Sequence, residues 1–109
     1  MRVKVDVTKA DIKYGKRAVC EECPVARAVS RALKSFDVEH ISVNDDNIIG
    51  VCYSKHGRVR PYRIATPAAA RRFINRWDYS EVEFGIRTDK LQYKHPKTSF
   101  APFSFYLTV

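Results

Sequence analysis

The stretch from Cys20 to Phe36 constrains the fold more than any other part of the chain. Its apolar residues recur every three or four positions, which is the spacing of one face of an α-helix. These residues are Val25, Ala28, Val29, Ala32, Leu33 and Phe36. Pro24 suits a first helical position, because the N–H that proline lacks would have no intrahelical partner there. The pattern predicts an amphipathic helix over about 23–35 that buries one face against the rest of the chain.

Apolar and polar residues alternate in several other segments, which is typical of half-buried strands. Strands are also expected at 38–43, at 58–64 and, more buried, at 48–54, whereas the alternating segments are 2–7, 82–86 and 103–109. The last of them carries Phe103, Phe105, Leu107 and Val109 on one face, so we expect it to lie inside the sheet. Pro61 cannot donate to a strand ladder, and it therefore predicts an edge or bulged position for its own strand. Asn and Asp at 44–47 predict a turn.

Two further short helices are indicated by their start signals. Thr8 reads as an N-cap, with Asp11 in the capping-box position. Gly15 is expected to end that helix in the left-handed conformation. Thr66 and Pro67 predict the start of another helix as N-cap and first residue. Its core stripe would be Ala70, Phe73, Ile74 and Trp77. Residues 88–99 are polar and basic, and they read as a loop or weak hairpin.

Together these elements predict an α+β fold in one domain, residues 1–109. We expect a largely antiparallel sheet with the helix at about 23–35 packed on it and one or two further short helices. No apolar run approaches the ~20 residues that cross a bilayer. The alternating start of the chain lacks the apolar core of a signal peptide. The expected location is therefore the cytoplasm, with no membrane partner.

The charge balance points to an anionic partner. Twenty Lys and Arg against twelve Asp and Glu give a net charge of +8. Such an excess favours nucleic acid, an anionic membrane surface or an acidic protein. From Asn47 to Trp77 the chain contains no Asp or Glu at all. The candidate binding residues in this acid-free segment are Lys55, Arg58, Arg60, Tyr62, Arg63, Arg71, Arg72 and Arg76.

The strand around Pro61 offers the sharpest form of this hypothesis. Because side chains alternate along a strand, Arg58, Arg60 and Tyr62 are predicted to lie on one common face. The two arginines would lie about 7 Å apart, which is close to the spacing of successive phosphates on one strand of nucleic acid. Tyr62 would then offer a ring for a base. The plainer alternative is a solvated basic edge with its aromatic residues in the core.

Three cysteines leave several interpretations open. Cys20 and Cys23 form a C-x2-C pair, and Cys52 and His56 add a C-x3-H pair, so that four zinc ligands are conceivable. Positions four apart on an extended strand lie about 13 Å from each other, so Cys52 and His56 need an intervening turn to share a metal. A redox pair at Cys20 and Cys23 is the second interpretation. Plain reduced thiols are the ordinary one, and no metal or cofactor is expected.

Catalysis finds little support in the sequence. The four glycines are isolated, and no phosphate-binding loop or metalloprotease motif occurs. We therefore expect a non-enzymatic protein with no small-molecule substrate. Arg27, Arg31 and Lys34 form a second basic face on the helix at about 23–35. Favourable interaction of cations with a helix C-terminus explains them without any ligand.

The chain resembles small phage-encoded proteins of uncharacterised function at two places. One match is A-D-I-x-x-G followed by C-x-x-C-P-V-A-x-A-x-x-R-A-L, from Ala10 to Leu33. The other is P-x-x-A-R-R-F-I from Pro67 to Ile74 with P-F-S-F-x-L from Pro102 to Leu107, where residues 79–101 intervene as an apparent insertion. The resemblance implies host takeover or anti-defence inside the host cytoplasm. The expected function is nucleic-acid binding through Lys55–Arg76. The alternative is an inhibitor that binds an acidic surface of a host protein.

Overall fold

The computed structural model describes residues 2–16, 19–53, 57, 59–78 and 100–109. The elements follow one another as β1 (Arg2–Val7), α1 (Lys9–Tyr14), α2 (Pro24–Ala32), the 3₁₀ turn η1 (Lys34–Phe36), β2 (Val38–Val43), β3 (Asn47–Tyr53), β4 (Val59–Ala65), α3 (Ala68–Asp78) and β5 (Phe103–Thr108). This arrangement confirms the predicted α+β class. The strand predicted at 82–86 and the loop predicted at 88–99 lie outside the described residues.

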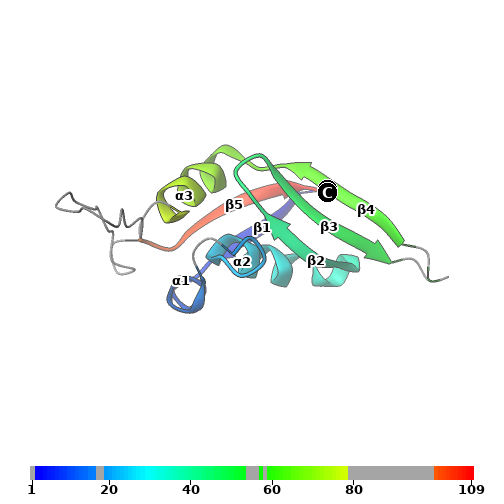
Figure 1. The fold of residues 1–109 in the computed structure, drawn as a ribbon, viewed down its shortest axis with the longest axis horizontal. Helices are drawn as coiled ribbons and strands as arrows, with labels where there is room; N and C mark the ends of the chain where they lie inside the picture. The colour runs from blue at the N-terminus through cyan, green and yellow to red at the C-terminus, as the bar shows by residue number, and fades with distance from the viewer. Residues whose placement is uncertain (1, 17–18, 54–56, 58, 79–99) are drawn as a thin grey trace, which may run out of the picture.

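The described strands form two antiparallel sheets. β1 pairs with β5 over their whole length, from Arg2 opposite Thr108 to Val7 opposite Phe103. β2, β3 and β4 form a meander in which β3 is central and β4 is one of the two edge strands, as Pro61 predicts. Figure 1 shows the long β3–β4 hairpin extending away from the helices, with the β1–β5 ribbon behind it. The residues between the sheets form one apolar core.

β5 differs from the prediction that it lies inside a sheet. In the part of the chain that the structure describes, its one hydrogen-bonded neighbour is β1. The second edge of β5 has no strand beside it among the described residues, and α3 packs on its apolar face. The ring of Phe103 stacks on that of Phe73 in α3, with the two centroids 4.9 Å apart. Aromatic packing from α3 therefore covers the Phe103 end of this apolar strand.

α2 is amphipathic as predicted, and it packs on both β1 and β2. Val25, Val29 and Leu33 are fully buried on its inner face. Phe36 departs from the predicted stripe, because its side chain is 37% exposed. The α-helix ends at Ala32, and the chain then tightens into η1 and turns at Asp37, whose φ is 59°. This change of geometry rotates Phe36 away from the face that Leu33 occupies.

A β-bulge shapes the inner face of β2. Residues 40 and 41 together oppose Gly50, because the register shifts between Glu39 and Ser42. His40 has a φ of 56°, which is the left-handed geometry that absorbs the extra residue. As a result Val38 and Ile41 both point into the core, although they are three positions apart. A Cβ on Gly50 would lie 2.8 Å from Val38 and 2.9 Å from Ile41, so this position has no room for a side chain.

α1 has the predicted capping box but not the predicted end. Thr8 and Asp11 exchange the two side-chain to backbone hydrogen bonds of the motif. Gly15 was expected in the left-handed conformation, and this is wrong: its φ is −69°, in the extended region. The glycine is needed for close approach. A Cβ would lie 2.6 Å from the ring of Pro24 and 2.7 Å from the Asp11 carbonyl oxygen, so α1 meets the start of α2 here without a side chain between them.

α3 begins at Ala68, one residue later than predicted. The Thr66 hydroxyl donates to the Asn44 carbonyl at 2.9 Å, which fastens the entry of the helix to the β2–β3 turn. The predicted core stripe is confirmed, since Ala70, Phe73, Ile74 and Trp77 are all buried. The indole N–H of Trp77 donates to the Lys16 carbonyl at 3.2 Å, so the polar group of this buried side chain has a hydrogen-bond partner.

The position of Leu33 gives a direct test of this packing. Leu33→Ala should lower the free energy of unfolding by about 2–5 kcal/mol, because the side chain is fully buried and leaves a cavity. Phe36→Ala should cost clearly less than Leu33→Ala, because Phe36 is 37% exposed whereas Leu33 is fully buried. Urea denaturation of both variants measures the two costs. Equal costs would mean that the inner face of α2 is assigned wrongly.

Candidate functional site

Within β4, Arg60 and Tyr62 share one face of the strand, as the two-residue period predicts, but this face is the one that meets the core. Arg60, Tyr62 and Ile64 alternate onto the inner side of the sheet, opposite Cys52, Gly50 and Ile48 respectively. Tyr62 and Ile64 are half-buried and pack against the core there. Arg60 lies near the far end of the strand, where its side chain is exposed. Lys55 and Arg58 lie outside the described residues.

Tyr62 is poorly placed to stack on a base. Burial raises the pKa of its hydroxyl, with a further contribution from nearby Cys52. Its oxygen is buried, and within the described residues it has no hydrogen-bond partner. A tyrosine that serves as a stacking platform has to offer an accessible ring face, whereas this ring is part of the packing under β4. The predicted stacking role of Tyr62 therefore has no support from its position.

Arg63 lies on the opposite, outer side of β4. It faces Ile49 across the ladder and is exposed. Because the side chains of a strand alternate between its two faces, Arg60 and Arg63 cannot contact the same flat ligand from one face. The β4 arginines are thus divided between two surfaces of the sheet.

The α3 arginines lie together more closely. Arg72 and Arg76 are four positions apart on the exposed side of the helix, which places them on one face. The guanidinium of Arg76 lies 4.8 Å from the ring centre of Phe100, so its position is partly determined by a cation–π contact. Arg71 is held by the backbone: its Nε donates to the Asp45 carbonyl at 3.1 Å, and its Nη2 to the Thr66 carbonyl at 3.3 Å.

The arginines of β4 and α3 form no ion pair with any carboxylate of the described residues. The arginines that the structure describes there are Arg60, Arg63, Arg71, Arg72 and Arg76. Solvent ions that gather at these exposed side chains can be replaced by a polyanion.

The cysteines do not gather as a four-ligand zinc set. Cys20 adjoins one end of β2, because its carbonyl accepts from the Val43 amide at 3.0 Å. Cys52 pairs with Val38 at the other end of the same strand, five residues or about 17 Å away. His56 lies outside the described residues, and no group of three metal-ligating side chains occurs within them. Cys23 is buried at the N-cap of α2, where its sulfur accepts from the Ala26 amide at 3.4 Å.

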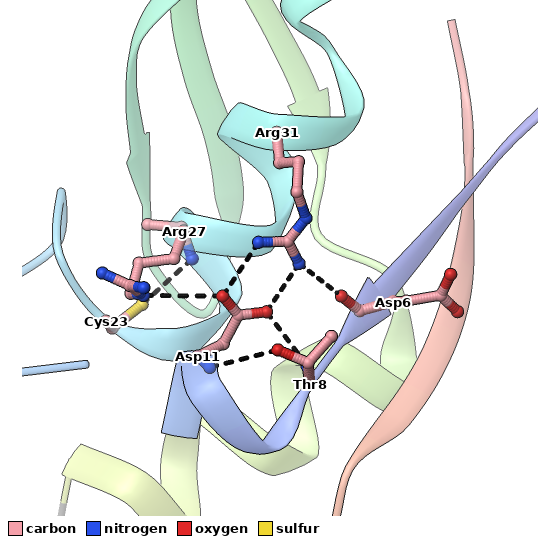
Figure 2. Close-up of polar contacts among 7 residues, drawn as sticks. Asp6, Thr8, Asp11, Cys23, Arg27 and Arg31 are labelled. Carbon is pink, nitrogen blue, oxygen red and sulfur yellow. Dashed lines mark hydrogen bonds and ion pairs between the residues drawn. The ribbon is translucent and has the colours of Figure 1, made fainter. Parts of the chain in front are cut away.

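The strongest electrostatic contact in the described structure is one that the sequence did not indicate. The Asp11 carboxylate is fully buried, and Arg31 contacts it with two hydrogen bonds: Nη1 to Oδ1 at 3.0 Å and Nη2 to Oδ2 at 2.7 Å (Figure 2). The Nε of Arg27 lies 3.5 Å from Oδ1, and the Thr8 amide donates to Oδ2 at 2.9 Å. Arg31 also donates to the Asp6 carbonyl at 2.9 Å. These contacts join β1, α1 and α2.

This cluster changes the interpretation of the second basic face. Arg27 and Arg31 were explained by the dipole of their helix, but the structure gives them a buried carboxylate as partner. Burial alone would raise the pKa of Asp11, yet the hydrogen bonds from Arg31 and Thr8 outweigh it and lower the pKa below its usual range. Lys34, the third member of that face, is exposed on η1. A buried, paired carboxylate of this kind stabilises the fold, and we assign it no binding role.

The comparisons with known proteins returned nothing to set beside this geometry: no family model, no curated protein and no solved structure matches the chain. None of the helices that the structure describes is both long enough and apolar enough to cross a membrane.

The Asp11 cluster predicts a pH-dependent loss of stability. Arg31→Met should lower the free energy of unfolding by about 1–3 kcal/mol at pH 7, because the buried Asp11 carboxylate loses two hydrogen bonds while Arg27 and the Thr8 amide remain. The folded-state pKa of Asp11 is lowered, so the stabilisation is complete above the unfolded pKa, near 3.9, and is lost as the pH falls through the folded value. The deficit of the variant should therefore shrink at pH 3.

Lys34→Met is the matched control, since it removes one exposed cation close to the same helix end. Urea denaturation of the wild type and both variants at pH 7 and pH 3 measures the effect. A deficit for Arg31→Met that equals that of the control at pH 7, or that grows in acid, would contradict the stabilising role of the cluster.

Proposed function

We propose that this protein binds nucleic acid without catalysing a reaction, and that α3 provides the main contact. The observation that carries the proposal is the exposed arginine surface of the acid-free segment. Arg72 and Arg76 lie on one face of α3, Arg71 lies beside them, and no described carboxylate neutralises any of the three. Arginine favours this use because its planar guanidinium contacts phosphate oxygens in a bidentate way.

The energetics of α3 also favour an anionic ligand. Like charges four positions apart destabilise a helix by about 0.2–0.5 kcal/mol. A polyanion that bridges Arg72 and Arg76 turns this repulsion into attraction. Arg71 is held by two carbonyl oxygens, so binding orders fewer side-chain torsions than it would for a mobile cation.

We assign β4 a smaller contribution to the nucleic-acid contact than α3. Arg63 lies on the exposed outer face of the strand, close to the end that leads into α3, and we expect it to add to the contact. Arg60 lies near the other end and on the other face, so its contribution should be smaller. Tyr62 is left out of the contact, because its ring packs against the core.

The rival function uses the same cations. An acidic surface of a host protein presents carboxylates that arginines also bind, and a phage-encoded inhibitor acting in the host cytoplasm would fit that use. The two functions differ in the source of the anion. Nucleic-acid binding releases condensed counterions and weakens steeply with salt, by about 0.9 log units per phosphate for each log unit of salt on duplex.

The double variant Arg72→Glu with Arg76→Glu tests the proposal. We expect its affinity for random-sequence nucleic acid at low salt to fall by about tenfold or more, with a shallower salt dependence, because two phosphate contacts are lost. Fluorescence anisotropy with labelled duplex and single strands measures both quantities. Arg72→Glu alone, which leaves the contact of Arg76 with Phe100 intact, should show a smaller loss in the same direction.

Lys9→Glu with Lys34→Glu is the control, since it makes the same change in net charge at two exposed lysines outside the acid-free segment. This control should keep most of the binding, and all variants should melt near the wild-type temperature. Equal losses in the two double variants would show a general charge effect and contradict a site on α3. Absence of any binding by the wild type at low salt would favour the acidic host protein instead.

A further inference from the structure

Both cysteines of the C-x2-C pair line one small cavity. It has a volume of about 60 Å³ and lies where the N-terminal end of α2 meets β2 and the end of α3. Its walls are formed by Val19, Cys20, Cys23, Val43, Ile74 and Asp78. The function proposed above uses none of these residues, and the acid-free segment contributes only the buried Ile74.

The backbone holds the two cysteines at fixed places around this cavity. The Glu22 amide donates to the Val19 carbonyl at 3.0 Å and closes a turn directly before α2. Cys20 is anchored to β2 through its carbonyl, and Cys23 caps the helix. Cys20 lies inside this turn, Cys23 follows it directly, and both line the same small cavity. A disulfide between them requires Cα atoms no more than about 7 Å apart.

The two thiols differ in accessibility. Cys20 is exposed, whereas Cys23 is buried. Burial raises the pKa of the Cys23 thiol, and the charges of nearby Asp78 and Cys20 raise it further. Cys23 is therefore kept as a protonated thiol near neutral pH, and Cys20 is the sulfur that a dissolved oxidant meets first.

We propose that Cys20 and Cys23 form a peroxide-sensitive dithiol that closes reversibly to an intramolecular disulfide. The cavity suits a small oxidant, since a water molecule occupies roughly 10–15 Å³ by this measure and a peroxide is only slightly larger.

The chemistry proceeds in two balanced steps. The Cys20 sulfur attacks one oxygen of hydrogen peroxide, the O–O bond breaks, and the second oxygen leaves as water with the thiol proton; Cys20 becomes a sulfenic acid. The Cys23 sulfur then attacks the Cys20 sulfur, the S–O bond breaks, and the hydroxyl leaves as water with the proton of Cys23. One peroxide thus oxidises two thiols to one disulfide and yields two waters. A dithiol reductant reverses the change by thiol–disulfide exchange.

Trypsin provides a clean test, because cleavage after Arg17 and Arg27 releases both cysteines in one peptide, and Cys52 is released in another. Folded protein is treated with hydrogen peroxide, blocked with an alkylating agent and digested without reduction. We expect the 18–27 peptide to lose the mass of two hydrogens and to escape alkylation. The thiol count should fall from three to one per chain, and dithiothreitol should restore it.

Three variants make the result specific. Cys52→Ser should still form the disulfide, whereas Cys20→Ser and Cys23→Ser should not; serine at residue 23 keeps the helix cap, so that variant should fold. Peptides that gain oxygen without losing two hydrogens would overturn the proposal. Disulfide-linked dimers, a disulfide that forms only in urea, or thiols that survive peroxide unchanged would overturn it equally.

Discussion

The apolar face of α2 is the contact on which the rest of this structure depends. Neither described sheet is large: one has two strands and the other three. A two-stranded ribbon is marginal in water unless something covers one of its faces. α2 packs on β1 of the first sheet and on β2 of the second, and its inner residues Val25, Val29 and Leu33 are completely shielded from water. One helix therefore contributes buried area to both sheets, and α3 adds to the same core.

The ion cluster around Asp11 fixes how this helix is oriented. Apolar contacts alone allow a helix to slide or rotate at little cost, whereas a bidentate arginine–carboxylate pair has a defined geometry. Arg31 contacts the Asp11 carboxylate and the Asp6 carbonyl at the same time. These contacts connect the C-terminal end of α2 to the junction of β1 and α1. Asp11 is thus used inside the fold, while no carboxylate of the described residues lies within ion-pair distance of the arginines of β4 and α3.

Much of the fold was predictable because its signals are local. The 3.6-residue period identified α2, the Thr8–Asp11 capping box identified α1, and Pro61 identified an edge strand. Features that depend on residues far apart were not predictable. The Arg31–Asp11 pair joins positions twenty residues apart, and the role of Gly15 depends on its contact with Pro24. The same division holds for the candidate site. The composition identified the arginines of the acid-free segment. The burial of Tyr62 and the placement of Arg60 and Arg63 on opposite faces of β4 depend on which side of the sheet meets the core.

The pairing of β1 with β5 has a consequence for how the chain folds. Arg2 and Thr108 are opposite each other in the ladder, so this ribbon joins the segments with the greatest sequence separation in the described structure. Contacts of such separation form late, because the entropy of closing the intervening loop has to be lost before they contribute. During synthesis β1 has to remain unpaired until β5 leaves the ribosome, about a hundred residues later at roughly 5–20 residues per second. The β2–β3–β4 meander and α2 can associate earlier, so the order of assembly runs from the middle of the chain outward.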